Sequence, residues 1–472
     1  MKRISLLAIV LFAFLSSSYA QYNIRFEVKN STDDTVILGQ YYMGGTFALD
    51  TSINKSGKFS FSNKKETLKQ GIYFFSNKKG KFCEFIVTDS QNMTFKTTDE
   101  DWVNNLIVKG SKDEQIYLDY IKKSNKHTAI FQSLSKEASS KEEYDRKLND
   151  LKIESDSLKE DFMNKYPQHF LTKVLKSSLA IKLPEFEKIY KEDGVVDSSA
   201  MQKIQWNYVK RHYFDNIDLT CEGLLRTPKG VFSRFYEAYW NDVMKYEKVD
   251  TIIYYADSLI NECKDNKEME KYFINDITRR YLLDNVMGHD AVYVHMVDKY
   301  FKTGRVTWFH PSDLDMNIER ANKWKNILIG KYVPDLACPE TDDNSTWHSL
   351  SSMNNKYKIL IFWSVECGHC TVEMPKIAEW YKDNKDIYNV GIYAVHTEGD
   401  ISDMQTFIKK YNMNWINVNG LYANYDWHEY FDIEKTPVIY ILDKNNKILA
   451  KNVAAEKIGD LLKVIEKGEF NL

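Results

Sequence analysis

The chain has 472 residues, and at roughly 150 residues per domain this length predicts about three domains rather than one catalytic core. Hydrophobic residues make up 43% of the chain and charged residues 28%, so most of it can bury a core and wholesale disorder is excluded. The formal net charge is −3 and no block of like charges occurs, which argues against a nucleic-acid partner.

The first twenty residues have the pattern of a signal peptide. Lys2 and Arg3 precede an apolar run over residues 4–15, and Ser18-Tyr19-Ala20 forms a small-x-small cleavage site. The apolar run is shorter than the roughly twenty residues that a membrane anchor needs. We therefore expect residues 1–20 to be removed, and the mature chain to be secreted across the inner membrane into the periplasm without membrane insertion.

Residues 21–110 alternate apolar and polar positions in the manner of β-strands. Ile24, Phe26 and Val28 show the period of two, and turn signals such as Gly44-Gly45 recur about every ten to fifteen residues. This pattern predicts a small antiparallel β-sandwich or barrel.

Over residues 111–329 the apolar spacing becomes helical and glycine becomes rarer. Ile252, Ala256 and Leu259 recur at intervals of three and four residues, which places them on one face of a helix. The pattern predicts an α-helical region without a repeat period clear enough to indicate a solenoid.

Residues 330–472 alternate strands and helices. A near-continuous apolar run over residues 357–363 suits a strand buried on both faces, and a second apolar run covers residues 390–395. The order is β-α-β-α, and it ends with a hairpin around Asp443 and a last helix. We predict an α/β domain with a mixed sheet.

The motif Cys367-Gly368-His369-Cys370 stands at the join between the first strand of this region and its helix. Two thiols at positions i and i+3 of a first helical turn are close enough to form a disulfide, and the free N–H groups there stabilise a thiolate. Half of a zinc site and a static disulfide are the alternatives. Zinc needs further ligands, and no second CxxC and no close Cys/His pair accompanies the motif, so redox chemistry without a bound cofactor or metal is favoured.

Four motifs together resemble the extracytoplasmic thioredoxin-like thiol-disulfide oxidoreductases of the TlpA/ResA type. They are GKYVPDL at 330–336, FWSVECGHC at 362–370, EMP at 373–375 and KTP at 435–437. The upstream β and helical parts are similar to modules that precede such domains in exported Bacteroidetes proteins. The resemblance implies a thioredoxin fold over residues 330–472 and activity on disulfides of exported proteins.

The resemblance implies a catalytic role for three residues. Cys367 is expected to be the attacking thiol and Cys370 the resolving thiol that releases the product. Glu373 follows Cys370 by three residues on the same helix face, where a carboxyl group of raised pKa could take the proton of the resolving thiol. The alternative for Glu373 is a solvated glutamate on the helix surface.

The resemblance also implies a substrate-binding surface around the thiols. Pro437 is expected to follow a cis peptide bond that leaves the Thr436 backbone free to pair with an extended substrate. The alternative for Pro437 is an ordinary proline at the start of a strand. The other residues expected to bind substrate are Trp363, Gly368 and His369.

Two positions depart from ordinary thioredoxins. Ile361 stands six residues before Cys367, where thioredoxins bury an aspartate, so proton transfer would depend on Glu373. The Gly368-His369 dipeptide resembles that of oxidising disulfide isomerases, and a cationic imidazole there favours the Cys367 thiolate. This stabilises the reduced form and shifts the poise toward oxidation. Because the potentials of CxxC proteins span about 150 mV, the motif alone does not fix the direction of electron flow.

The remaining four cysteines are scattered through strand and helix patterns, where a buried free thiol is the expected role. They are Cys83, Cys221, Cys263 and Cys338. A third redox thiol is an alternative only for Cys338, which precedes Pro339 ahead of the α/β region.

We therefore expect an exported thiol-disulfide oxidoreductase that acts on protein disulfides and is reduced again by an electron-donating thiol-disulfide partner. Two other classes are open: a ligand- or protein-binding module with a vestigial CxxC, and a thiol peroxidase. A peroxidase nucleophile needs the pattern Pro-x-x-x-Thr-x-x-Cys. Leu360 and Ser364 occupy the Pro and Thr positions before Cys367, which disfavours the peroxidase.

Overall fold

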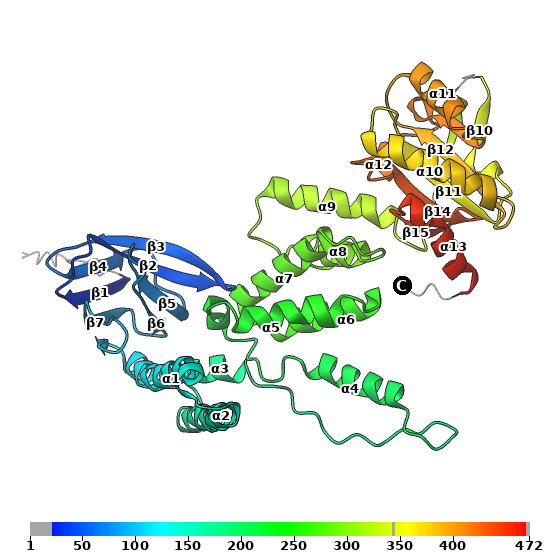
Figure 1. Cartoon of the computed structure of the whole chain (residues 1–472). Coiled ribbons are helices and arrows are strands. Elements are labelled where there is room, and N and C mark those ends of the chain that lie inside the picture. Colours follow the sequence, from blue (N-terminus) through cyan, green and yellow to red (C-terminus); the bar gives the residue numbers. More distant parts are fainter. Residues whose placement is uncertain (1–20, 342–344, 469–472) are drawn as a thin grey trace, which may run out of the picture. The chain divides into compact units, whose positions relative to one another are not determined.

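The structure is a computed structural model of the chain, and it describes residues 21–341 and 345–468. It divides into two compact units, Met1–Lys245 and Tyr246–Leu472 (Figure 1). The predicted signal peptide, residues 1–20, lies outside the described residues. Across the described ranges, no helix is long and apolar enough to cross a membrane.

The first unit begins with two four-stranded sheets, ordered β4-β1-β7-β8 and β3-β2-β5-β6. The strand pairs are antiparallel except for β1 and β7, which run parallel. The strands are β1 (Tyr22–Lys29), β2 (Thr35–Tyr42), β3 (Gly45–Ile53), β4 (Lys58–Asn63), β5 (Gly71–Ser76), β6 (Phe82–Val87), β7 (Asn92–Thr98) and β8 (Ile107–Lys109).

Phenylalanine side chains from both sheets form the core between them. Phe26 of β1 stacks on Phe75 of β5 with ring centroids 4.2 Å apart, and Phe75 lies 4.7 Å from Phe85 of β6. All three rings are fully buried. Residues two apart on a strand face the same side, so the period of two brings these rings into one interior. The predicted β-sandwich is confirmed, but it is not antiparallel throughout, because β1 and β7 pair in parallel.

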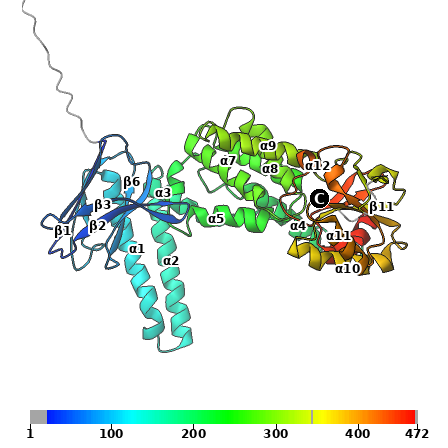
Figure 2. The same cartoon turned by 90° about the horizontal axis from the view of Figure 1, so that it is seen from above.

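Helices follow the sandwich within the first unit. The first two lie side by side as a hairpin that projects from the sandwich (Figure 2). Ser111 and Ser140 cap them, because each side chain accepts a hydrogen bond from the N–H three residues further on. The helical segments are α1 (Lys112–Glu137), α2 (Lys141–Lys165), α3 (Phe170–Lys176), α4 (Ser198–His212), η1 (Glu222–Arg226), α5 (Phe232–Ala238) and η2 (Tyr239–Met244).

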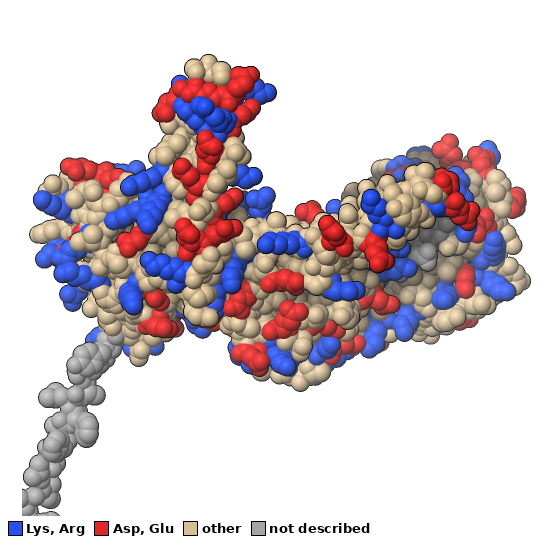
Figure 3. All heavy atoms as spheres, turned by 90° about the horizontal axis from the view of Figure 1, so that it is seen from below, with Lys and Arg blue, Asp and Glu red and all other residues tan. Residues whose placement is uncertain are grey.

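Acidic and basic side chains are mixed on the projecting hairpin and over the rest of the face in Figure 3. Lys147 and Glu143, for example, form an ion pair at 2.9 Å across one turn of α2. Such pairs between partly exposed side chains add little to the stability of a helix. The mixing agrees with the formal net charge of −3.

The second unit starts with further helices, so the division between the units falls inside the helical region predicted over residues 111–329. Ile252, Ala256 and Leu259 are buried on one face of the first of these helices, as their spacing predicts. Because the helical spacing continues across Tyr246, the sequence does not mark the division. The segments are α6 (Val249–Glu262), α7 (Lys267–Leu282), α8 (Asp290–Met296), η3 (Val297–Phe301) and α9 (Pro311–Asn326).

A five-stranded mixed sheet, ordered β13-β12-β11-β14-β15, forms the rest of the second unit. β12 pairs parallel with both β11 and β13, whereas β14 pairs antiparallel with β11 and β15. The elements are β9 (Ala337–Pro339), β10 (Trp347–Ser349), η4 (Leu350–Ser352), β11 (Tyr357–Trp363), α10 (Gly368–Asn384), β12 (Val390–His396), α11 (Ile401–Lys410), β13 (Ile416–Asn419), η5 (Gly420–Tyr422), α12 (Trp427–Tyr430), β14 (Val438–Asp443), β15 (Ile448–Lys451), η6 (Ala455–Lys457) and α13 (Ile458–Glu466).

The central strand β11 is buried along its whole length. Ile361 and Trp363 face the core that also contains Cys370 of α10, and Phe362 faces a second core on the opposite side of the sheet. Burial on both faces explains why this strand is apolar except for Lys358, whose buried amino group donates to Leu350 and Asn446. The predicted mixed α/β sheet is confirmed.

Candidate active site

The CxxC motif lies where the chain leaves β11 and begins α10 (Figure 1). Cys367 is the N-cap residue of α10 with extended backbone angles (φ −84°, ψ 114°), and Cys370 lies in the first turn. The N–H groups of a first turn have no partner inside the helix and form the positive end of the helix dipole. The structure thus places the motif where the sequence predicts it.

The segment before β14 forms the second side of the site. β14 pairs with β11 so that Val438 lies opposite Phe362, which brings Thr436 and Pro437 to the end of β11. The peptide bond between Thr436 and Pro437 is cis. The Cys367 thiol donates a hydrogen bond to the carbonyl oxygen of Thr436, with 3.0 Å between sulfur and oxygen. Two segments 69 residues apart in the sequence therefore meet at this thiol.

The two thiols of the motif differ in exposure and in pKa. Cys367 is partly exposed and Cys370 is fully buried, and both are free thiols. Burial disfavours the Cys367 thiolate, but hydrogen bonds with the Thr436 side chain, with the backbone and thiol of Cys370 and with the backbone of His369 outweigh burial and lower the pKa. Burial raises the pKa of Cys370 to about 11. Cys367 is therefore the thiol of the pair that ionises first.

A buried serine connects the loop in front of the motif with the loop that follows β12. The Ser364 hydroxyl donates to the carbonyl of Glu398 at 3.0 Å and accepts from the N–H of Glu366 at 3.1 Å. The N–H of Thr397 donates to the carbonyl of Trp363 at 3.0 Å. Nothing in the sequence around Ser364, Thr397 or Glu398 marks these contacts. The β-α-β order is the available signal, because the carboxyl ends of parallel strands meet at one sheet edge.

Trp363 does not belong to the surface around the thiols. Its side chain is fully buried, with its ring centroid 5.7 Å from that of Phe407 and 6.2 Å from that of His396. The prediction that this side chain binds substrate is wrong, because the alternation along β11 points it into the core shared with α10. Gly368 and His369 are exposed at the start of α10. Their contact with substrate stays a prediction.

Glu373 lies on α10 and is partly exposed. Its carboxylate accepts a hydrogen bond from the amino group of Lys376 at 2.6 Å. Among the hydrogen bonds of the described residues, none joins Glu373 to Cys370. The contact with Lys376 fits the alternative of a glutamate on the helix surface, and the role of Glu373 in proton transfer stays a prediction.

A buried imidazole that the sequence pattern does not predict packs beside the last residue of β11. His396 is the last residue of β12 and lies opposite Trp363 of β11. It is fully buried, and within the described ranges neither ring nitrogen has a hydrogen-bond partner. Burial lowers its pKa to about 4, although the nearby Asp400 acts in the opposite direction. The ring is therefore neutral near pH 7.

The other four cysteines are buried, as predicted. Burial raises the pKa of Cys263 and of Cys338 to about 12, and it also raises the pKa of Cys83 and of Cys221. A buried thiol that stays protonated is a poor nucleophile near neutral pH. The structure therefore favours packing over a redox role for Cys338.

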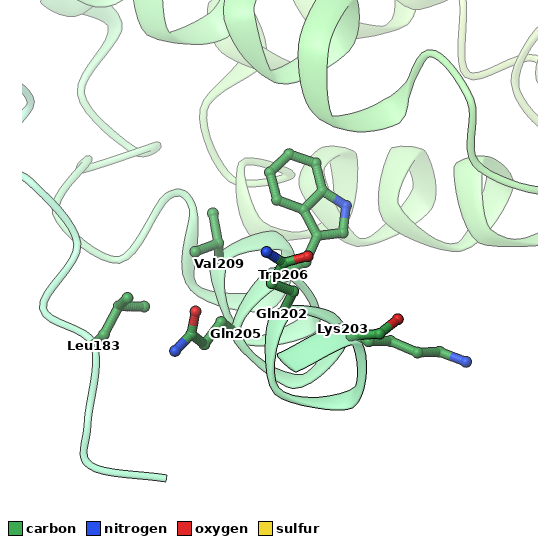
Figure 4. Close-up of a pocket in the computed structure, with 7 residues that line it drawn as sticks. Leu183, Gln202, Lys203, Gln205, Trp206 and Val209 are labelled. Atoms are coloured by element: carbon green, nitrogen blue, oxygen red, sulfur yellow. The ribbon is translucent and has the colours of Figure 1, made fainter. Parts of the chain in front are cut away.

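A cavity of about 610 Å³ lies in the first unit, against α4 (Figure 4). Trp206 of α4 and Leu183 of the preceding segment line it, and these side chains are 43% and 50% exposed. The lining contains no thiol, carboxylate or imidazole. This cavity therefore offers no group for disulfide chemistry.

Two segments of the chain match known families. Residues 329–451 match the AhpC/TSA family, and residues 22–117 match a domain of unknown function, DUF4369. The first match covers the five-stranded sheet together with the motif and the Thr436-Pro437 segment. The C-terminal part of the chain is an AhpC/TSA thioredoxin-like domain, in agreement with the resemblance in its sequence.

The known proteins to which the chain is similar include the following three. It is 35% identical over 69 residues to the soluble secreted antigen MPT53 of Mycobacterium tuberculosis, which is 15% of this chain and 38% of the antigen. It is 26% identical over 148 residues to the thiol-disulfide oxidoreductase ResA of Bacillus subtilis, which is 31% of this chain and 80% of ResA. A crystal structure of a domain of a possible thiol-disulfide isomerase from Cytophaga hutchinsonii is 35% identical, with 30% of this chain and 95% of that chain covered and a TM-score of 0.28. The predicted relationship to thiol-disulfide oxidoreductases is confirmed.

The difference between the two thiols predicts their order of alkylation. In the reduced full-length protein at pH 7, iodoacetamide should modify Cys367 at least roughly 10-fold faster than Cys370. Cys367 has both the larger thiolate fraction and the greater solvent exposure. Peptide mapping by mass spectrometry between pH 6 and 10 gives the rate at each thiol. The Cys367 rate should rise with pH through a pKa below the ordinary value of 9.0. Equal rates at the two thiols would contradict the assignment.

Proposed function

We propose that this thioredoxin-like domain is a thiol-disulfide oxidoreductase that reduces disulfides in exported proteins. The observation that carries the proposal is the pairing, within one helical turn, of a partly exposed thiol of lowered pKa with a buried thiol of raised pKa. Such a pair gives Cys367 the role of attacking the substrate and Cys370 the role of releasing it. The similarity to the oxidoreductase ResA supports the same chemistry.

In the first step the Cys367 thiolate attacks one sulfur of a substrate disulfide. The S–S bond of the substrate breaks, a mixed disulfide between Cys367 and the substrate forms, and the other substrate sulfur leaves as a thiolate that takes up a proton. The backbone of Thr436 lies at the attacking sulfur. An extended substrate segment that pairs with this backbone would present its disulfide to Cys367.

In the second step Cys370 loses its proton and attacks the sulfur of Cys367. The mixed disulfide breaks, a disulfide between Cys367 and Cys370 forms, and the second substrate sulfur is released as a thiol. The substrate has then gained two electrons and two protons, and the enzyme dithiol has lost them. A dithiol partner must supply them again, and no bound cofactor takes part.

The raised pKa of Cys370 makes its deprotonation the demanding event of the second step. At a pKa of about 11, only about one Cys370 in 10⁴ is a thiolate at pH 7. We assign the role of base to Glu373, which follows on the same helix. Its carboxylate would exchange the ion pair with Lys376 for the proton of the resolving thiol, directly or through a water molecule.

The proposed substrates follow from the expected location. Residues 1–20 have the pattern of a secretory signal, and the similar antigen MPT53 is named a secreted protein. Disulfides form and persist in extracytoplasmic compartments and are rare in the cytosol. We therefore place the enzyme in the periplasm, with exported proteins as its substrates.

Insulin reduction tests the proposed function. With dithiothreitol as the electron donor, the full-length protein should accelerate insulin reduction, and a Cys367→Ser/Cys370→Ser variant should be no faster than dithiothreitol alone. Cys221→Ser is the matched control, since it removes a buried thiol outside the motif and should keep the activity. A double variant that keeps the wild-type rate would favour a binding module with a vestigial motif.

The assigned order of attack predicts which single variant traps substrate. Cys370→Ser should accumulate mixed disulfides because Cys367 can attack but nothing resolves the product, whereas Cys367→Ser should accumulate few. Non-reducing gels of cells that carry each variant measure the trapped species. Equal trapping by both variants would show that the roles of the two thiols are not distinct.

The proposed base predicts a step-specific defect. Glu373→Gln keeps the shape of the side chain and removes the base, so release from the mixed disulfide should slow by roughly 10²-fold while attack by Cys367 changes little. Rapid-mixing kinetics with a peptide disulfide resolve the two steps. Glu379→Gln, on an exposed position of the same helix, is the control. Wild-type release by the Glu373→Gln variant across pH 6 to 8 would leave Glu373 as a surface residue.

A further inference from the structure

Helix α9 contacts the segment that leads to the cis peptide bond at the redox site. The indole N–H of Trp324 donates a hydrogen bond to the carboxylate of Asp432, and the guanidinium of Arg320 lies 3.2 Å from the carboxylate of Glu434. Arg320 and Trp324 are four residues apart and therefore share one face of α9. Both acidic partners precede Thr436, whose carbonyl accepts the hydrogen bond of Cys367.

The end of α9 is also fixed to the mixed sheet. Ile327 follows the helix and packs in the core on one face of the sheet. The carbonyl of Ile327 accepts a hydrogen bond at 3.2 Å from the amino group of Lys451, a buried residue of β15 that also pairs with Asp290 of α8. The hydroxyl of Tyr430 donates to the carbonyl of Asn326 at 3.2 Å. The helix end and the sheet thus form one packed body.

Of the contacts that α9 makes with Asp432 and Glu434, the one with Asp432 is the stronger candidate for holding the segment before Thr436. The indole of Trp324 is half-buried and packs on Tyr293 of α8, with ring centroids 4.9 Å apart. Its hydrogen bond to a carboxylate is charge-assisted and partly shielded from water. Glu434 is 65% exposed in its pair with Arg320, and exposed ion pairs contribute little.

We infer that Trp324 is a positioning residue for the redox site: it holds Asp432 and thereby the start of the short segment that presents Thr436 to Cys367. The inference rests on the proposed function only in taking Cys367 as the reacting thiol. It adds a residue of helix α9 to the groups that shape the site, although α9 lies upstream of the family match, which begins at residue 329.

The pH dependence of Cys367 alkylation in the reduced full-length protein tests this inference. Trp324→Phe keeps an aromatic ring against Tyr293 and removes the donor to Asp432. Because the hydrogen bond of the Thr436 side chain, rather than that of its carbonyl, lowers the pKa of Cys367, misalignment of Thr436 should raise that pKa. We expect the alkylation profile to move up by about half a pH unit, which is an about threefold lower rate below the midpoint. A merely structural role for Trp324 would not move this midpoint.

Trp308→Phe is the matched control. The indole N–H of Trp308 donates to Asn275 of α7 at 2.9 Å, in the same unit, rather than to the segment before Thr436. Its profile should match the wild type. Asp432→Leu should reproduce the shift of Trp324→Phe, and the double variant should shift no further, because both changes break one hydrogen bond.

Three results would overturn the inference: a wild-type profile for Trp324→Phe, an equal shift for Trp308→Phe, or additive shifts for Trp324→Phe and Asp432→Leu. Circular dichroism and melting curves identify a variant that does not fold, and Asp432→Leu then supplies the comparison. The measurement needs only the reactivity of Cys367. It therefore stays informative whether or not the wild-type protein reduces insulin, which tests the proposed function separately.

Discussion

The burial of β11 on both faces and the pairing of β11 along both edges determine the geometry of the redox site. The parallel neighbour β12 and the antiparallel neighbour β14 fix where two loops arrive at the end of β11. One loop brings Glu398 to the hydroxyl of Ser364, and the other brings Thr436 to the thiol of Cys367. A shift in either register would separate these groups, so the packing of the strand is what sets the chemistry of the thiol.

The same packing makes the two sulfurs of the motif unequal. Cys367 stands at the N-cap, in reach of donors that favour its thiolate, whereas Cys370 enters the core one turn later and is kept protonated by burial. Two thiols that differ in exposure and pKa suit a reaction in which one sulfur attacks first and the other reacts only after the mixed disulfide has formed. Two equally exposed thiols would lack this order.

Local patterns predict the parts of the structure that depend on local forces. The apolar run of β11 and the CxxC at the following helix start are visible in neighbouring residues, and so are the strands of the sandwich. The orientation of Trp363 is not visible in the sequence. A strand buried on both faces is apolar at almost every position, so the residue types do not tell toward which core a side chain points. The contact between Trp324 and Asp432 joins residues 108 apart, and no pattern in either neighbourhood marks it.

The division of the helices between two units is also hidden in the sequence, and for a related reason. Helices on both sides of Tyr246 bury apolar residues at helical spacing, for example Leu151 and Phe162 of α2 and Ile252 and Ala256 of α6, so this spacing does not say which unit a helix packs into. Membership in a unit depends on which surfaces meet in three dimensions. The upstream helices α8 and α9 are thus neighbours of the thioredoxin-like sheet through Asp290 and Ile327, although the motifs of the family begin only after them.

Equilibration of the full-length protein with glutathione buffers tests most directly whether Cys367 and Cys370 form a reversible redox couple. Acid quenching, alkylation and peptide mapping at each ratio of reduced to oxidised glutathione report the state of every cysteine. We predict a two-electron transition in which one disulfide forms between Cys367 and Cys370 while the four buried cysteines outside the motif stay reduced. Absence of that disulfide at every buffer ratio, or its formation with one of the other cysteines, would contradict it.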